Sequence, residues 1–189
     1  MKTLDRYILE KFQITKDSTP YTYHPKDKFE LRKILKRRLS EDKNADLNNI
    51  DVSNITDMGY EGFENITGLF QSLNPCNIDI SKWNMSNVTD TRGMFYDCKN
   101  FDCDLSEWDI SNVKNMNIMF SGCENFKGEG LENWDVSHVE NMNGMFRGCI
   151  QFTGKGLNKW NVSNIKNLRY MFKGCTSLKN KPSWYKLTL

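Results

Sequence analysis

A short stretch of sequence recurs along this chain at a nearly constant interval, and a tryptophan marks each copy. The five tryptophans are separated by 25, 26, 26 and 24 residues: Trp83, Trp108, Trp134, Trp160 and Trp184. Such a period is typical of repeat proteins, in which each unit buries its apolar side chains only against its neighbours. The sequence therefore predicts a stack of similar units, with the tryptophans forming one column of its core.

The residues that follow each tryptophan are repeated as well. The segment Trp108-Asp-Ile-Ser-Asn-Val113 has close counterparts after Trp83, Trp134 and Trp160. A phenylalanine stands twelve residues after each of these tryptophans, and a cysteine follows three residues later: Phe95, Cys98, Phe120, Cys123, Phe146, Cys149, Phe172 and Cys175. An earlier, degenerate copy has Ile50 in the position of the tryptophan and carries an insertion, which we place as a loop near 59–62.

The spacing within one repeat suggests its secondary structure. Leu105, Trp108 and Ile110 have the L-x-x-L-x-L spacing of a leucine-rich repeat, whose short strand points alternate side chains inward. The return segment, with Met116 and Met119 on one apolar face, favours a short helix or helical turn. The expected fold class is α/β: a leucine-rich-repeat solenoid with short parallel strands, a helical or irregular convex side and an N-terminal helical cap.

The full motif resembles a known family. The pattern W-[DN]-[VIM]-S-N-V-x-[ND]-M-x-x-M-F-x-x-C-x-x-F is similar to the BspA-like leucine-rich repeat, and the resemblance covers roughly residues 47–189. The resemblance implies a curved β/α solenoid used for adhesion or protein binding. Many members of that family carry secretion signals and surface anchors.

Because the repeats begin at about residue 47, we expect two regions. These are an N-terminal helical cap over 1–46, and a solenoid of about five repeats with a C-terminal cap strand over 47–189. Within the cap, 25–39 reads as an amphipathic helix, and a second short helix is expected at about 4–12. Candidates for the buried stripe of the longer helix are Phe29, Leu31, Ile34, Leu35 and Leu39.

Charge and hydropathy limit the expected partners of the protein and the cellular compartments in which we expect it. The formal net charge is +2, so the overall balance does not demand nucleic acid or an anionic membrane as partner. Asp5, Arg6, Glu10 and Lys11 interrupt the apolar residues at the N-terminus, which argues against a signal peptide. No apolar run approaches the length of a membrane span. We expect a cytoplasmic protein, in the host cytoplasm if a phage encodes it; a trimmed secreted protein would look the same.

The residue types used for catalysis and metal binding do not gather in a recognisable pattern. The cysteine column repeats with the period of the chain and contains no C-x-x-C pair, which favours reduced core thiols over disulfides or a metal site. His24 and His138 are the only histidines. Asp109 and Asp135 are expected to be neighbours on adjacent strands, as part of a polar ladder. We predict no catalytic site, no metal and no cofactor.

Binding residues are sought among positions that differ between repeats, because uniform columns suit structural roles. These variable positions are Arg92, Tyr96, Lys114, Ile118, Glu140, Arg147, Lys166, Arg169, Tyr170 and Lys173. Tyrosine and arginine dominate interface hot spots, which favours Arg92, Tyr96, Arg147, Arg169 and Tyr170 as partner contacts. Further candidates are Asp109 and Asp135 on the expected concave face, and Tyr60 and Phe63 in the inserted loop.

The function expected from these features is a non-enzymatic protein-binding module, such as an inhibitor or adaptor that a phage or bacterium directs at a host protein. The partner is another protein of unknown identity. Two alternatives stay open: a nucleic-acid-binding protein that uses the basic stretch Arg32–Arg38, and a surface adhesin truncated from its export signal.

Overall fold

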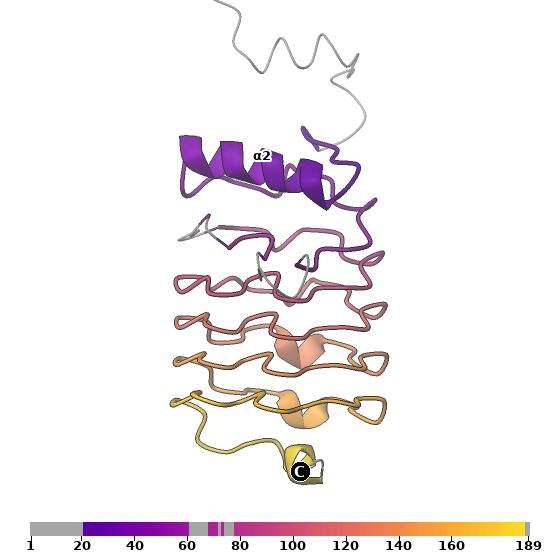
Figure 1. The fold of residues 1–189 in the computed structure, drawn as a ribbon, viewed down its shortest axis with the longest axis vertical. Coiled ribbons are helices and arrows are strands. Elements are labelled where there is room, and N and C mark those ends of the chain that lie inside the picture. Colours follow the sequence, from indigo (N-terminus) through magenta and orange to yellow (C-terminus); the bar gives the residue numbers. More distant parts are fainter. Residues whose placement is uncertain (1–20, 61–67, 72, 74–77, 188–189) are drawn as a thin grey trace, which may run out of the picture.

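The computed structural model describes residues 21–60, 68–71, 73 and 78–187. The chain winds through a series of similar layers stacked along the long axis (Figure 1). Helix α2 (Lys28–Glu41) lies across one end of the stack. Three short 3-10 helices complete the secondary structure: η1 (Leu131–Asn133), η2 (Leu157–Lys159) and η3 (Ser183–Leu187).

The expected leucine-rich-repeat solenoid with a parallel sheet is wrong. The described residues form no β-strand; isolated parallel bridges join one layer to the next along a column of Asp57, Asp90, Asn115, Asn141 and Asn167. The L-x-x-W segments, where strands were expected, form 3-10 helices in two layers, and the return segments form turns rather than helices. The expected C-terminal cap strand is likewise replaced by η3.

Local hydrogen bonding explains why turns replace strands. Five N–H groups in the layer after Trp108 donate to carbonyl oxygens three residues earlier: those of Val113, Met119, Ser121, Cys123 and Phe126. Asp and Asn side chains accept the N–H two residues later at several places in the repeat, as at Asp104, Asp109 and Asn115. These side-chain bonds offer the backbone an alternative to extended structure. Each layer is therefore a succession of turns whose repeated apolar residues point inward.

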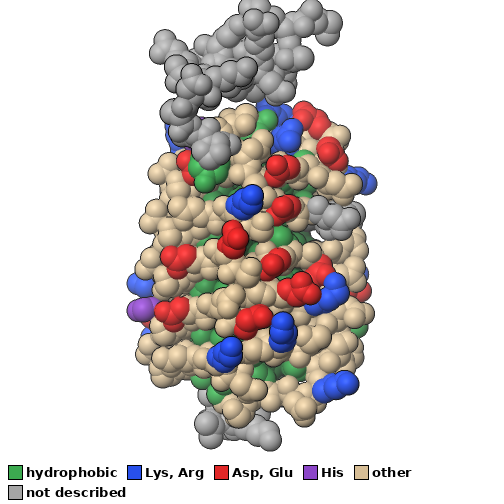
Figure 2. Space-filling model, turned by 180° about the vertical axis from the view of Figure 1, so that it is seen from behind, with side chains coloured by type: hydrophobic (Ala, Val, Ile, Leu, Met, Phe, Trp, Pro, Cys, Tyr) green, Lys and Arg blue, Asp and Glu red, His purple; other side chains and the backbone are tan. Residues whose placement is uncertain are grey.

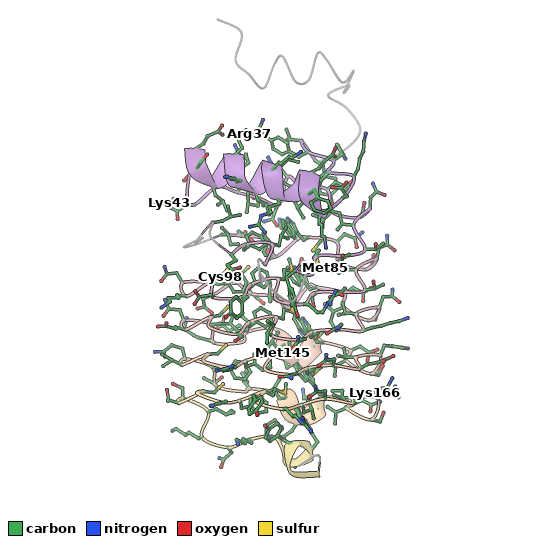
Figure 3. The ribbon with its side chains drawn as sticks, in the orientation of Figure 1. Arg37, Lys43, Met85, Cys98, Met145 and Lys166 are labelled. Carbon is green, nitrogen blue, oxygen red and sulfur yellow. The ribbon has the colours of Figure 1, made fainter. Side chains whose placement is uncertain are left out.

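The repeated apolar residues stack in columns, as predicted. The Trp108 and Trp134 rings lie 6.4 Å apart and nearly parallel, and the Phe120 and Phe146 rings stack at 5.8 Å. The indole N–H of every tryptophan donates to a backbone carbonyl of the preceding layer: Leu47, Ile80, Leu105, Leu131 and Leu157. Figure 3 shows Met145 in the interior of this stack. Each tryptophan thus both fills the core and satisfies a buried carbonyl.

The cysteine column is also in the core. The thiols of Cys123, Cys149 and Cys175 donate to the carbonyl oxygen of the phenylalanine one layer earlier, at 2.9–3.0 Å. Burial raises the pKa of the Cys98 thiol to about 12 and that of Cys175 to about 11, and it raises the pKa of Cys123 and Cys149 well above the usual 9.0. All four thiols are therefore protonated, and those of Cys123, Cys149 and Cys175 tie neighbouring layers together.

Helix α2 covers the first layer. Asp27 caps it by accepting the N–H groups of Phe29 and Glu30, and Leu31, Leu35 and Leu39 are buried against the stack. Phe29 does not belong to the buried stripe, because 52% of it is exposed. The second helix expected at about 4–12 lies outside the described residues. The confirmed part of the cap is therefore the amphipathic helix itself.

Glycine is required where the backbones of two layers approach closely. A comparison of Gly130 with Gly148 measures how much this close approach contributes to stability. Gly130 has φ of 87°, and a Cβ there would lie 2.3 Å from the Ser106 amide nitrogen. Gly148 has φ of 75°, but a Cβ would meet nothing closer than 3.7 Å. We expect Gly130→Ala to lower the free energy of unfolding by about 2–3 kcal/mol and Gly148→Ala by about 1 kcal/mol, since only the first adds a backbone clash to the left-handed strain. Urea unfolding of both variants measures the difference, and equal losses would contradict it.

Candidate partner-binding site

One side of the stack carries a continuous ladder of backbone hydrogen bonds. In the layer of Trp134, four N–H groups at alternate residues donate to carbonyl oxygens of the next layer at 2.8–3.1 Å: Met142 to Asn167, Gly144 to Arg169, Phe146 to Met171 and Gly148 to Lys173. The layer before it makes the same four bonds from Met116, Ile118, Phe120 and Gly122. All these N–H groups point toward the C-terminal end of the stack, and the carbonyl groups point toward α2.

Five of the predicted partner contacts lie beside this ladder. Arg92, Tyr96, Arg147, Arg169 and Tyr170 occupy the ninth, tenth or thirteenth position after their tryptophan, so successive layers bring them to the same side. We call this side the ladder face. The chain alternates between inward and outward residues here, with Met116, Met142 and Leu168 buried between the outward positions. The structure therefore unites most of the candidate residues on a single surface.

The structure corrects the placement of Tyr60. Its N–H donates to the carbonyl of Arg92, which makes it the ladder residue of the first layer and not part of an inserted loop. Tyr60 is buried, and the Arg92 guanidinium lies 5.3 Å from the centre of its ring. Arg92 also pairs with Asp90 at 2.7 Å. These two residues support each other at the N-terminal end of the ladder face, while Phe63 lies outside the described residues.

The C-terminal part of the ladder face is different, because its side chains point into solvent. We call Arg147, Arg169, Tyr170 and Lys173 the C-terminal patch. Tyr170 is 58% exposed, and the Lys173 ammonium lies 5.7 Å from the centre of its ring. None of the carboxylates in the described part of the chain forms an ion pair with Arg147, Arg169 or Lys173. The patch is thus cationic and aromatic at once.

Tyr170 adopts an unusual backbone conformation. Its φ is 59°, in the left-handed region that Gly93 and Gly144 occupy at the equivalent position of other layers. This conformation costs a non-glycine residue roughly 1–2 kcal/mol. Ile118 stands at the same position with φ of 48°. Observed strain of this kind concentrates at functional positions, and here it places an aromatic ring in solvent.

Comparison with known proteins places the chain in a family. A family model described as Mycoplasma protein of unknown function, DUF285, matches residues 30–126 and again 64–185. The chain belongs to the DUF285 family. The two DUF285 matches overlap, as expected when a model spans several copies of a repeat. No curated protein and no solved structure matches the chain. The resemblance to BspA-like repeats stays a prediction.

Asp109 and Asp135 lie apart from the ladder face in this DUF285 chain. Both are exposed, neither lies in a strand, and each accepts the N–H of a serine two residues later. Hydrogen bonds from Ser111 and Ser137 lower the pKa of both carboxyls, and this outweighs the repulsion that Asp135 exerts on Asp109. Both are therefore charged at neutral pH, which argues against an acid/base pair.

Acidic side chains gather on the side of the stack that faces away from the viewer in Figure 1. Figure 2 shows them following one another from layer to layer, with lysines and arginines among them. The structure also has an open hollow of about 370 Å³, lined by Asp79, Lys82, Asp102, Asp104 and Glu107 among others. Within the described ranges, no group of three or more metal-ligating side chains is close enough to hold an ion. The DUF285 stack thus has an acidic region in addition to its cationic C-terminal patch.

The basic stretch of α2 serves the fold of the cap. Arg32 donates to the carbonyl of Gly68 at 2.8 Å, and the Arg37 and Arg38 guanidinium groups lie 5.4 and 5.9 Å from the centre of the Tyr23 ring. Figure 3 shows Arg37 on this helix at the end of the stack. In the part of the chain that the structure describes, no helix is long and apolar enough to cross a membrane.

His138 interrupts a column of asparagines. Asn87, Asn112 and Asn164 each donate from Nδ2 to the carbonyl of a serine in the preceding layer, at 2.6–2.8 Å. His138 instead lies 3.3 Å from the Ser137 hydroxyl. We expect His138→Asn to add the missing bond, to the Ser111 carbonyl, and to raise the free energy of unfolding by about 0.5–1 kcal/mol. Thermal unfolding checks this, with Asn112→His as the reciprocal control; a loss of stability in His138→Asn would contradict it.

Proposed function

We propose that this DUF285 chain is a non-enzymatic protein-binding module that contacts its partner through the C-terminal patch. The observation that carries the proposal is Tyr170: an exposed ring on a strained backbone, beside two arginines and a lysine that no described carboxylate neutralises. Tyrosine and arginine bury large areas at protein interfaces and form strong charge-assisted hydrogen bonds there. An inhibitor or adaptor requires no more than such a surface.

The rigid setting of the patch supports the same function. The backbone of Arg169 and Lys173 is held by ladder bonds from Gly144 and Gly148, at 2.8 Å each. Side chains on a fixed scaffold lose less conformational freedom when they bind than side chains on a mobile loop. The patch is therefore preorganised, with Arg147 and Lys173 at equivalent positions of adjacent layers.

Affinity capture with matched variants tests the proposal. The protein is immobilised and exposed to a Mycoplasma lysate, chosen from the description of the family, in three forms: wild type, the double variant Arg169→Glu/Tyr170→Ala, and Lys159→Glu as control. Lys159 is an exposed lysine of η2, away from the ladder face. We expect a stoichiometric partner with wild type and control, and at least tenfold less with the double variant. A partner that the double variant retains would contradict this assignment of the surface.

A further inference from the structure

The backbone ladder ends openly at the C-terminal patch. The N–H groups of Leu168, Tyr170, Phe172 and Gly174 correspond to the donors Met142, Gly144, Phe146 and Gly148 of the layer before. No acceptor for these four N–H groups exists among the residues that the structure describes. We call this row the open edge.

The C-terminal 3-10 helix covers a different part of the last layer. Trp184 of η3 stacks on Trp160 at 6.4 Å, and Tyr185 packs against the Phe172 ring at 5.0 Å. Arg169, Tyr170, Lys173 and Gly174 stay exposed. Helix η3 therefore seals the tryptophan side of the core and leaves Tyr170 and Gly174, which carry two of the four edge donors, exposed.

The opposite end of the ladder is closed by cations. Lys28 of α2 donates to the carbonyl of Gly59 at 3.2 Å, and Arg32 donates to that of Gly68 at 2.8 Å. This is the end toward which the ladder carbonyls point, so positive side chains meet the negative end of aligned peptide dipoles. By the same reasoning as for a helix terminus, the open edge is the positive end and favours negative charge or carbonyl oxygens.

We propose that the open edge pairs with an extended acidic segment of the partner protein, an inference that rests on the proposed function. The four N–H groups stand at every second residue, and an extended chain presents a carbonyl toward one side at every second residue. Carboxylates on such a segment meet Arg147, Arg169 and Lys173, which flank the row. A row of four donors matches a linear series of acceptors rather than a single anion.

A second copy of the chain does not supply the matching acceptors. The complementary edge would be the carbonyl edge of the first layer, and α2 covers that edge with Lys28 and Arg32. The charges agree with this, because joining the two ends would bring those cations toward Arg169 and Lys173. The occupant is therefore a segment of a different protein.

Amide hydrogen exchange on the intact protein tests the open edge. In the free protein, the amides of Leu168, Tyr170 and Phe172 should exchange at least tenfold faster than those of Met142, Gly144 and Phe146, their paired equivalents. Adding a peptide of alternating glutamate and threonine should slow exchange at the four edge amides. Edge amides that are protected in the free protein and become exposed on dilution would show that a second copy occupies the edge, which would overturn the proposal.

Two control peptides separate main-chain pairing from charge attraction. One has lysine in place of glutamate; the other keeps every glutamate but has esters in place of alternate amides, which weakens its carbonyl acceptors. We expect no binding of the first and about tenfold weaker binding of the second. Equal affinity of the amide and ester peptides without protection of the edge would overturn the pairing. The proposed function would still stand if Arg169→Glu/Tyr170→Ala lost the captured partner, so the two failures are distinguishable.

Discussion

Raising the pH from 8 to 10 is expected to lower the free energy of unfolding by about 5 kcal/mol, because the buried cysteines resist ionisation. Burial raises the pKa of all five described thiols: to about 11 for Cys103 and Cys175, to about 12 for Cys98, and well above the usual value for Cys123 and Cys149. In the unfolded chain these thiols ionise near their ordinary pKa. Above that pH the unfolded state binds fewer protons than the folded state, so stability falls as the pH rises, by about 1 kcal/mol per thiol at pH 10.

Urea unfolding at pH 8, 9 and 10 measures this dependence. Lysines and tyrosines also begin to titrate at the upper end of the range, so the comparison that matters is between variants. The double variant Cys123→Ala/Cys149→Ala removes two of the five thiols and should show a slope with pH that is smaller by about two fifths. If the free energy of unfolding of this variant falls with pH as steeply as that of the wild type, the thiols do not cause the pH dependence.

Trp134→Ala is expected to lower the free energy of unfolding by about 3–5 kcal/mol. The side chain is 4% exposed and lies between two layers, stacked on Trp108 at 6.4 Å and against Phe120 at 6.3 Å. Its removal leaves a cavity in the middle of the stack, where neither layer can close the gap without breaking its own ladder bonds. It also leaves the Leu105 carbonyl without the indole donor that now lies 3.1 Å away.

Trp134→Phe separates these two contributions. The phenyl ring keeps most of the packing but loses the N–H donor, and we expect a loss of about 1–2 kcal/mol. Chemical unfolding at neutral pH compares the two variants with the wild type. A Trp134→Phe variant as unstable as Trp134→Ala would show that the hydrogen bond, and not the stacking, dominates.

The sequence predicted the columns of the stack correctly and its backbone incorrectly. Trp108, Phe120 and Cys123 align with their counterparts because period and apolar pattern determine which residues are buried. The backbone was misread because L-x-x-L-x-L spacing alone does not distinguish a strand from a series of turns. The side chains of Asp109 and Asn115 favour turns because each accepts a backbone N–H two residues later. Such hydrogen bonds depend on local geometry, which the spacing of apolar residues does not reveal.

The candidate site was predicted in part. Variation between repeats singled out Arg147, Arg169 and Tyr170, which the structure brings onto one surface. The same reasoning put Tyr60 in a loop, because the insertion hid its register with Arg92. Backbone donors such as those of Leu168 and Phe172 have no signature in a sequence. Their availability depends on which layer is last and on what η3 covers.

Every ladder bond, indole bond and thiol bond described above joins one layer to the next. Among the described residues, none of these three kinds of bond skips a layer, so a middle repeat meets the same surroundings on both sides. A gene that duplicates or deletes one whole repeat would therefore encode a chain whose interior bonds are all retained, with α2 still covering the first layer and η3 still covering the tryptophan side of the last. Length can vary in this architecture while α2 and the C-terminal patch are preserved, so related proteins can differ in the distance between these two ends.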